Sequence, residues 1–537
     1  MPAFLPTSGS AHPRRLTGLF TGLAAGLLLV GCGNGTALRL GPSPPELPLP
    51  AGIRLAFNHR AEHRYRSPIS GQWRQGDDLE ALLLEAIEAS RQEILVAVQE
   101  LSLPDVAAAL VERQRHGVRV RVVLENTYST PWSQENPASL PPHQRHRVEQ
   151  LRALGLGDAV LMLRQGGVPM LDDTADGSAG SGLMHHKFMV VDQRVVVTGS
   201  ANFSPSCIHG DPDDPSSRGN VNHLLRFESP ALARLFTTEF GRMWGDGPGG
   251  KPDSHFGIAK QEGKAQRVLV AQTPVEVLFA PHRRSDANQG LLWLDSQLAR
   301  VRRRLDLALF VFSAQNLTDR LSALHAKGVQ LRLLADPGFA NRSFSEVLDL
   351  LAITLPDHRC RIEAGNRPWS SPLEGVGIPQ LAGGDKLHHK IAVLDRRWVI
   401  SGSFNWSPSA AFVNDETLLL IDSKPLARHF EHEIDRLWRG ADLGVNRRLQ
   451  RKRLKQRQRC GQGLARNNKP VPLQPVTGRA TQAESHQEEA QPERDYDGRS
   501  PSLIVRSSDG PGTPLPRHHP ATRRHQSDAA GSAHPPR

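Results

Sequence analysis

Cysteine is scarce in this chain of 537 residues. Its four cysteines are Cys32, Cys207, Cys360 and Cys460. No two of them form a Cys-x-x-Cys pair, so the spacing of a structural zinc site is absent. If Cys32 is modified, three cysteines remain, and a disulfide between Cys207 and Cys360 is one pairing that the sequence leaves open.

Aromatic residues are also few, at 5% of the chain, and hydrophobic residues make up 38%. Both values are low for a chain long enough to hold two or three domains, which indicates that part of it does not pack into a core. The charge is uneven as well. Residues 446–537 contain 18 Lys and Arg against 8 Asp and Glu, so they carry +10 of the net charge of +11. The body is therefore nearly neutral, without the overall charge excess expected around a polyanion channel.

A single long apolar run, Leu16–Val30, follows Arg14 and Arg15. Its length suits the apolar region of an export signal and is short for a membrane span. The run ends Leu29-Val30-Gly31-Cys32, which is similar to the lipobox of bacterial lipoproteins. This resemblance implies cleavage before Cys32, with lipid on its thiol and on the new amino terminus. A plain signal peptide and an uncleaved anchor are the alternatives. We expect a lipid-anchored protein of the bacterial envelope, in the periplasm or at the outer membrane.

One pattern of polar residues occurs twice. It reads His-x-Lys, four residues, Asp, six residues, Gly-Ser-x-Asn. The residues are His185, Lys187, Asp192, Gly199, Ser200 and Asn202 in the first copy, and His388, Lys390, Asp395, Gly402, Ser403 and Asn405 in the second. Two complete copies at the same spacing are not explained as ordinary buried hairpins. A binding-only descendant without catalysis remains an alternative.

Each copy predicts two short strands joined by a tight polar turn. In the first copy the apolar runs Phe188–Val191 and Val195–Val197 are typical of strands buried on both faces. Alternate side chains of a strand share a face, so the His and the Lys point the same way. An imidazole, an ammonium, a hydroxyl and an amide aimed at one point suit an anionic phosphoryl group.

Two such sets facing each other predict phosphoryl transfer. One imidazole can attack phosphorus and become a phosphohistidine, while the other protonates the departing oxygen and later takes a proton from water. The two Lys and two Asn would stabilise charge on the equatorial oxygens. This chemistry requires no metal and no cofactor.

The doubled motif resembles the phospholipase D superfamily, over roughly residues 53–440. The resemblance implies that His185 is the nucleophile and His388 the general acid. It implies the catalytic set His185, Lys187, Asp192, His388, Lys390 and Asp395, in which the two aspartates are mainly structural or orienting. The residues expected to bind the phosphate are Ser200, Asn202, Ser403 and Asn405.

The superfamily also tends to carry Asn-x-Glu shortly after the motif. The second copy keeps it as Asn414-Asp415-Glu416, which makes Glu416 an orienting residue, whereas the first copy has Asn220-Val221-Asn222. The two halves are therefore not equivalent at this position.

Two further groups of polar residues lie near the motifs in the sequence. His186 and His389 alternate away from the site, so we expect them to pack or to form hydrogen bonds. An acidic metal site at Asp172, Asp173 and Asp176 would lack any recognised ligand spacing.

The order of elements repeats in the two halves. The first half predicts a helix, a strand, a helix and a strand over residues 79–90, 94–98, 105–115 and 118–124, and the second half over residues 291–303, 305–312, 318–326 and 329–334. Such alternation favours a mainly parallel or mixed sheet flanked by helices. A Leu, Phe and Trp pattern at helical spacing recurs at residues 232–244 and 426–438, which predicts a closing helix in each half.

We therefore predict two phospholipase D-like α/β domains related by a pseudo-two-fold axis, with disordered terminal segments. The predicted parts are a signal peptide (1–31), a linker (32–52), domain 1 (53–246), a linker (247–271), domain 2 (272–441) and a basic disordered tail (442–537). Loops over residues 127–182 and 367–385 are expected to form the rim of the cleft. The chain is expected to be a monomer, because both motifs lie in it.

The sequence predicts a phosphodiesterase that hydrolyses the head-group phosphodiester of phospholipids to phosphatidic acid through a phosphohistidine. The expected lipid anchor would hold the site beside a bilayer, which favours this substrate. A non-specific endonuclease and a cardiolipin-synthase-like phosphatidyltransferase are the alternatives. The basic run at residues 447–459 is expected to be a solvated tail, or else to contact anionic lipid or nucleic acid.

Overall fold

The structure is a computed structural model, and it describes residues 48–175, 182–260 and 263–461. These residues fall within one compact unit. The predicted export signal, Cys32 and residues 462–537 lie outside the described residues. Within the described part of the chain, no helix is long and apolar enough to cross a membrane.

The first half is built on a seven-stranded sheet in the order β1-β9-β8-β7-β4-β5-β6. Its elements are β1 (Ile53–Phe57), β2 (Arg64–Arg66), β3 (Trp73–Gln75), α1 (Leu79–Glu88), β4 (Glu93–Val98), α2 (Pro104–Arg115), β5 (Arg119–Leu124), η1 (Asn126–Tyr128), η2 (Trp132–Gln134), η3 (Pro137–Ser139), α3 (Pro142–Ala153), α4 (Ala159–Gln165), β6 (Met170–Asp172), β7 (Lys187–Val191), β8 (Val195–Gly199), α5 (Pro205–Ile208), β9 (His223–Glu228) and α6 (Pro230–Trp244). Strands β4, β5 and β6 pair in parallel, and the other neighbours pair antiparallel.

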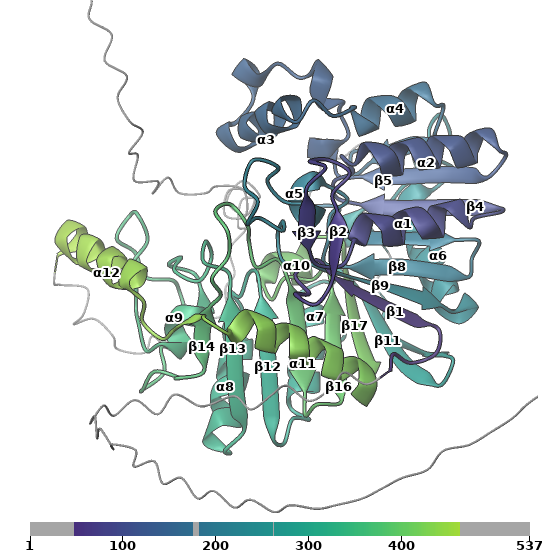
Figure 1. The fold of residues 1–537 in the computed structure, drawn as a ribbon. Helices are drawn as coiled ribbons and strands as arrows, with labels where there is room; N and C mark the ends of the chain where they lie inside the picture. The colour runs from purple at the N-terminus through teal and green to yellow at the C-terminus, as the bar shows by residue number, and fades with distance from the viewer. Residues whose placement is uncertain (1–47, 176–181, 261–262, 462–537) are drawn as a thin grey trace, which may run out of the picture. The chain divides into compact units, whose positions relative to one another are not determined.

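The second half repeats this arrangement on a nine-stranded sheet in the order β10-β11-β17-β16-β15-β12-β13-β14-β18 (Figure 1). Its elements are η4 (Gly257–Ala259), β10 (Gln266–Val270), β11 (Thr273–Ala280), α7 (Gly290–Leu298), β12 (Arg304–Leu309), α8 (Gln315–Ala326), β13 (Gln330–Ala335), α9 (Glu346–Leu350), β14 (Val376–Ile378), β15 (Lys390–Leu394), β16 (Trp398–Gly402), α10 (Pro408–Phe412), β17 (Glu416–Asp422), α11 (Lys424–Trp438), β18 (Asp442–Leu443) and α12 (Arg447–Cys460). The predicted α/β fold with mixed sheets flanked by helices is confirmed.

The two halves share one core. A single apolar cluster contains residues of both sheets together with the closing helices α6 and α11, among them Phe236 and Phe430. Each closing helix has a serine cap and a proline at its first or second position, and Ser229 and Ser423 accept from the backbone N–H three residues on. Burial of their apolar faces against the sheets positions the motif hairpins of both halves over a common core.

The motif hairpins β7–β8 and β15–β16 turn through two residues with positive φ, Asp192 with Gln193 and Asp395 with Arg396. This backbone is that of the tight hairpin turn whose twist matches its flanking strands. The Asp192 carboxylate accepts from the backbone N–H groups of Arg91, Gln92 and Glu93 at 2.8, 2.7 and 2.9 Å. Asp395 makes the same three bonds in the second half, to residues 302–304.

Both aspartates therefore fasten a hairpin turn to the start of the neighbouring strand. The turn lies at the opposite end of β7 from His185, roughly 20 Å away at the rise of an extended strand. This placement corrects the inclusion of Asp192 and Asp395 among the catalytic residues, because both carboxylates bind the backbone at the far end of the strand.

We expect Asp192→Ala to lower the free energy of unfolding by about 2 kcal/mol, because three backbone N–H groups lose their acceptor in a partly solvated turn. Turnover per folded molecule should be unchanged. Urea unfolding followed by tryptophan fluorescence gives the first value, and Arg194→Ala in the same turn is the matched control. A loss of turnover beyond the loss of folded protein would return Asp192 to the catalytic set.

Three predicted boundaries differ in the structure. Residues 127–182 contain α3 and α4 rather than only loop. The linker predicted at 247–271 includes the edge strand β10. Only one residue of β10 is buried, so its sequence does not show the apolar run of a core strand. The disordered tail predicted from residue 442 begins instead with β18 and α12, which are ordered to Cys460.

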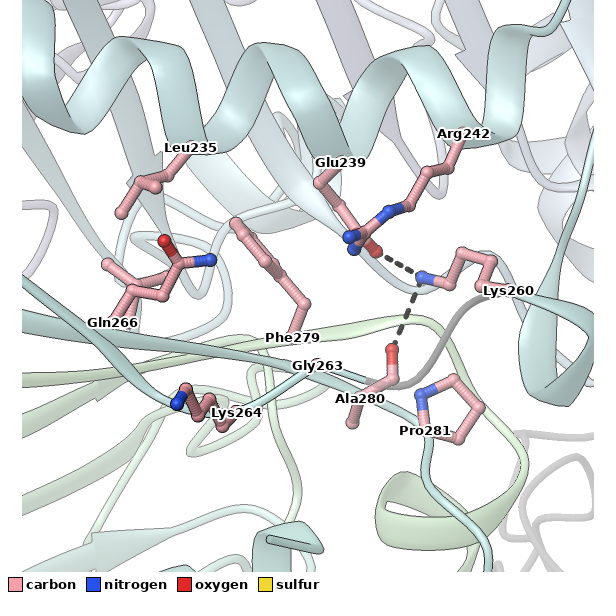
Figure 2. A pocket seen from close by; sticks show the side chains of 11 residues that line it. Leu235, Glu239, Arg242, Lys260, Gly263, Lys264, Gln266, Phe279, Ala280 and Pro281 are labelled. Carbon is pink, nitrogen blue, oxygen red and sulfur yellow. Dashed lines mark hydrogen bonds and ion pairs between the residues drawn. The ribbon is translucent and has the colours of Figure 1, made fainter.

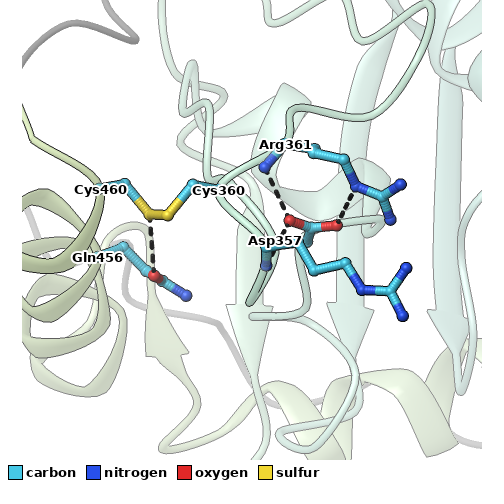
Figure 3. Close-up of a disulfide and its surroundings, with 6 residues drawn as sticks. Asp357, Cys360, Arg361, Gln456 and Cys460 are labelled. Atoms are coloured by element: carbon cyan, nitrogen blue, oxygen red, sulfur yellow. Dashed lines mark hydrogen bonds and ion pairs between the residues drawn. A yellow bond between two sulfur atoms is a disulfide. The ribbon is translucent and has the colours of Figure 1, made fainter.

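The disulfide pairing also differs. Cys360 is bonded to Cys460 at a sequence separation of 100 (Figure 3). Cys207 is a free, buried cysteine. The pairing of Cys207 with Cys360 that the sequence left open is therefore wrong. The actual partner lies on α12, in the segment expected to be without structure.

Candidate active site

The two histidine–lysine pairs lie at equivalent strand starts, β7 and β15. Lys187 Nζ donates to the carbonyl of His185 at 2.8 Å, and Lys390 Nζ donates to that of His388 at 2.9 Å. Both lysines are almost fully buried. Each ammonium is therefore held beside its own histidine, as the alternation of a strand predicts.

Each motif is hydrogen-bonded to the opposite half of the chain. The backbone N–H of His185 donates to the carbonyl of Asp415 at 3.0 Å, and that of His388 donates to the carbonyl of Val221 at 3.1 Å. Short parallel bridges, Met184 with Asp415 and Val221 with Leu387, flank these bonds. The segment that follows each motif thus pairs with the residues just before the histidine of the other motif. This pairing brings both motifs to one interface.

The same crossing gives each imidazole a partner from the other half. His185 Nδ1 lies 2.7 Å from Glu416 Oε1, so a carboxylate faces this ring nitrogen. His388 Nδ1 lies 2.9 Å from Asn222 Oδ1. Glu416 and Asn222 occupy equivalent positions, so one ring faces a carboxylate and the other a neutral amide. The contact places Glu416 beside the His185 ring, where an orienting role is predicted for it, and Asn222 is its counterpart.

The two serines hold these partners. Ser200 Oγ donates to Asn222 Oδ1 at 2.8 Å, and Ser403 Oγ donates to Glu416 Oε2 at 2.6 Å. Both hydroxyls also accept a backbone N–H from the adjacent strand. This corrects the prediction that Ser200 and Ser403 bind the phosphate, since their hydrogen-bonding capacity is spent on positioning.

The two asparagines of the motif differ from the serines. Asn202 Nδ2 donates to Gln99 Oε1 at 3.2 Å, whereas the Asn405 side chain has no hydrogen-bond partner among the described residues. Asn405 is nevertheless buried. The buried atom without a partner is the acceptor Oδ1, which is costly to leave unpaired. The Nδ2 group of the same amide carries the N–H donors that suit an oxygen of a bound group.

The electrostatics show that the two imidazoles share one environment. Burial lowers the pKa of His185 well below its usual value, and the charges of Lys187 and Lys390 lower it further. Burial likewise lowers the pKa of His388, and Lys390, Lys187 and the His185 ring add to the effect. Each ring thus feels the ammonium of the other half.

The lowered pKa values favour the neutral form of both rings, and each ring stays slightly exposed to solvent, at 6% for His185 and 7% for His388. The Nε2 atoms have no hydrogen-bond partner in the part of the chain that the structure describes. A neutral imidazole with a free Nε2 beside two ammonium groups is prepared to attack an anionic phosphorus centre.

The wall of the site differs between the halves at one pair of positions that sequence reasoning missed. Gln99 follows β4 and accepts from Lys187 Nζ at 3.2 Å. Its counterpart Phe310 follows β12, lies under Lys390 Nζ at 4.7 Å and contacts the His388 ring at 4.7 Å between centroids. Phe339 packs on Phe310, and both rings are partly exposed. In the sequence, only the position of Gln99 and Phe310 at the ends of two predicted strands could have indicated that they line the site.

His186 and His389 point away from the site, as predicted. His186 contacts Thr417 Oγ1 at 2.9 Å and Glu239 at 3.3 Å, and His389 contacts Glu433 at 3.3 Å. Both are fully buried.

A separate hollow lies beside α6 and β11 (Figure 2). Its lining includes Glu239, Lys260 and Phe279. Burial alone would lower the pKa of Lys260, but Asp415, at 2.7 Å, and Glu239 raise it. The buried ammonium thus ties the segment between the halves to both of them. No group of three or more His, Cys, Asp or Glu side chains within residues 48–175, 182–260 and 263–461 could hold a metal ion.

Comparison with known proteins decides the family. The family model described as "Cardiolipin synthase, PLD-like domain" matches residues 83–244 and 294–438, which is more than half of the chain. The chain belongs to the phospholipase D superfamily. Each match covers one motif, so both halves are phospholipase D-like domains.

The chain is similar to a mitochondrial cardiolipin hydrolase of Xenopus tropicalis, with 28% identity over 30% of this chain and 65% of that one. It is also similar to a phospholipase D of Rickettsia felis, with 25% identity over 26% of this chain and 58% of that one. The chain covers 54–65% of the length of the first three curated relatives that it matches. A phosphatidylserine synthase structure from Haemophilus influenzae is similar at 14% identity and a TM-score of 0.47, over 74% of this chain and 89% of that one.

Proposed function

We propose that this phospholipase D-like chain hydrolyses the head-group phosphodiester of phospholipids to phosphatidic acid, through a phosphohistidine at His185. The observation that carries the proposal is the unequal pairing of the two rings, His185 with the Glu416 carboxylate and His388 with the Asn222 amide.

In the first step Nε2 of neutral His185 forms a bond to phosphorus, and the bond from phosphorus to the head-group oxygen breaks. The phosphorylated ring gains positive charge, which the Glu416 carboxylate stabilises at Nδ1. Asn222 can only orient its ring, so His388 is suited to move a proton. Protonated His388 donates that proton to the departing oxygen.

In the second step neutral His388 takes a proton from water, the hydroxide forms a bond to phosphorus, and the bond to His185 breaks. Both lysines and the amides of Asn202 and Asn405 stabilise the charge on the remaining oxygens throughout. Binding of the anionic phosphodiester between the lysines offsets the charges that lower the pKa of His388, which favours the protonated acid in the complex.

A lipid substrate is supported by the partly exposed rings of Phe310 and Phe339 beside His388, which offer apolar surface to the leaving group. Relatives named for cardiolipin and phospholipid substrates agree with it. Export is supported by the Cys360–Cys460 disulfide, because such bonds persist in oxidising compartments. Lipidation at Cys32 and the monomeric state are part of the same proposal.

The test is turnover of labelled phosphatidylcholine, phosphatidylglycerol and plasmid DNA by the mature protein. Release of head group with formation of phosphatidic acid is the expected result, and it should be absent in His185→Ala. Nicked plasmid without head-group release would assign an endonuclease instead. Phosphatidyl transfer to glycerol in place of hydrolysis would assign a phosphatidyltransferase, and binding without turnover would overturn catalysis.

A further inference from the structure

Helix α12 concentrates positive charge in an ordered element. It has eight Lys and Arg among its 14 residues and no acidic residue. Like charges four residues apart repel each other, and arginines in the first turn oppose the helix dipole. The helix therefore gains little from its own sequence, and its order depends on how it is fastened to the body.

The inner side of α12 supplies that fastening. Leu449 is buried in the core of the second half. The Asn446 side chain caps the helix by accepting from the backbone N–H of Leu449 at 2.8 Å. At the other end, Cys460 is bonded to Cys360, a residue of the loop before β14 (Figure 3). Both ends are held, so one side of the helix always faces the protein.

The outer side presents a row of cations. Arg447, Arg451, Lys455 and Arg459 recur every four residues, and all four are exposed. They span about 18 Å of helix. Leu454 lies beside them with 58% of its surface exposed. Within the described residues, no carboxylate forms an ion pair with any of these four cations.

A chain of contacts links α12 to the active site. Arg448 donates to the carbonyl of Pro337, at 3.4 Å, in the loop that follows β13. Phe339 of the same loop packs on Phe310, which contacts the His388 ring. Arg342 lies over Phe339 at 4.8 Å and adds a further cation beside that ring.

We propose that the outer face of α12, formed by Arg447, Arg451, Leu454, Lys455 and Arg459, binds the surface of an anionic phospholipid bilayer. Four cations in line with one exposed leucine match a flat layer of anionic head groups. The disulfide places the helix outside a reducing compartment, where a bilayer surface is the anionic partner at hand. Docking there would hold the opening beside His388 against the membrane.

This binding does not require hydrolysis, so it can be tested apart from the proposed function. The probe is sedimentation of the full chain carrying Cys32→Ser, which removes the proposed lipid anchor, with phosphatidylcholine vesicles that contain or lack phosphatidylglycerol. We expect binding only with phosphatidylglycerol, weakening as salt rises. The triple variant Arg447→Gln, Arg451→Gln, Lys455→Gln should lose roughly 100-fold in affinity, at about 1 kcal/mol for each cation.

The matched control removes three positive charges from the end of the first half that holds the β7–β8 turn, by Arg91→Gln, Arg115→Gln and Arg194→Gln. This variant should bind vesicles as the parent does. Turnover of a soluble short-chain substrate should be equal in all of them. Cys460→Ser, which frees the end of α12, should weaken vesicle binding several-fold.

Equal losses in the two triple variants would overturn the proposal, as would equal binding to both kinds of vesicle. Binding of plasmid DNA that depends on α12 while vesicle binding does not would assign the helix to nucleic acid. Vesicle binding without any head-group release would leave this inference standing and remove the proposed function.

Discussion

His388→Ala is expected to accumulate a covalent phosphoryl group on His185 when the substrate has an activated leaving group. Such a leaving group departs without a proton, so the first bond forms, but no base remains to activate water in the second step. Steady-state turnover should fall by roughly 10⁴-fold while one equivalent of leaving group appears in a burst. Stopped-flow absorbance measures the burst, and mass spectrometry of acid-free digests locates the adduct.

His185→Ala is the paired control. It should show neither burst nor adduct, because the attacking nitrogen is gone while His388 stays in place. An adduct on His388 in the His185→Ala protein would show that the two roles are reversed. Circular dichroism and thermal unfolding of both variants separate a chemical defect from loss of folded protein.

Glu416→Gln is expected to lower kcat by roughly 10²–10⁴-fold, with a smaller change in KM, because a neutral amide no longer stabilises the charge that develops on the His185 ring. The variant keeps the shape of the side chain and its contact with Ser403. Rapid quench of a single turnover with an activated substrate measures the rate at which His185 is phosphorylated, and that rate should fall.

Asn222→Asp is the converse change at the equivalent position. A carboxylate beside Nδ1 of His388 raises the pKa of that ring, which burial and the lysines otherwise hold low. A general acid with a higher pKa keeps its proton to higher pH, so the alkaline limb of kcat should move upward. An unchanged pH profile in Asn222→Asp, or an unchanged kcat in Glu416→Gln, would contradict the cross-paired site.

The repeating elements and both motif hairpins could be predicted because their signals are local. Apolar runs on either side of the Asp192 turn give two strands, and strand alternation puts His185 and Lys187 on one face. The mixed sheet and the closing helices follow from the same kind of pattern. These features require no knowledge of how the halves meet.

The cross-pairing of the halves could not be predicted in this way. No local sequence pattern indicates that Glu416 contacts His185, which lies 231 residues earlier, or that Asn222 contacts His388. The same gap explains the error over Ser200 and Ser403. A hydroxyl beside a phosphate-binding motif suggests a donor to phosphate, and only the contact between the halves shows what it donates to instead.

The ordered α12 was missed for a different reason. Its composition is typical of disorder, because eight cations and almost no apolar residues cannot form a core. The helix is held by one buried leucine and by a cysteine whose partner lies 100 residues earlier. Pairing of cysteines depends on the fold, so the sequence alone left it open.

The measurement that tests the central claim most directly is the stereochemical course at phosphorus. Two imidazoles acting in turn on one phosphorus atom give two in-line displacements, each with inversion. Hydrolysis or alcoholysis of a chiral phosphorothioate analogue should therefore proceed with overall retention, as read by ³¹P NMR. Overall inversion would mean a single displacement by water, without a phosphohistidine, and would contradict the account.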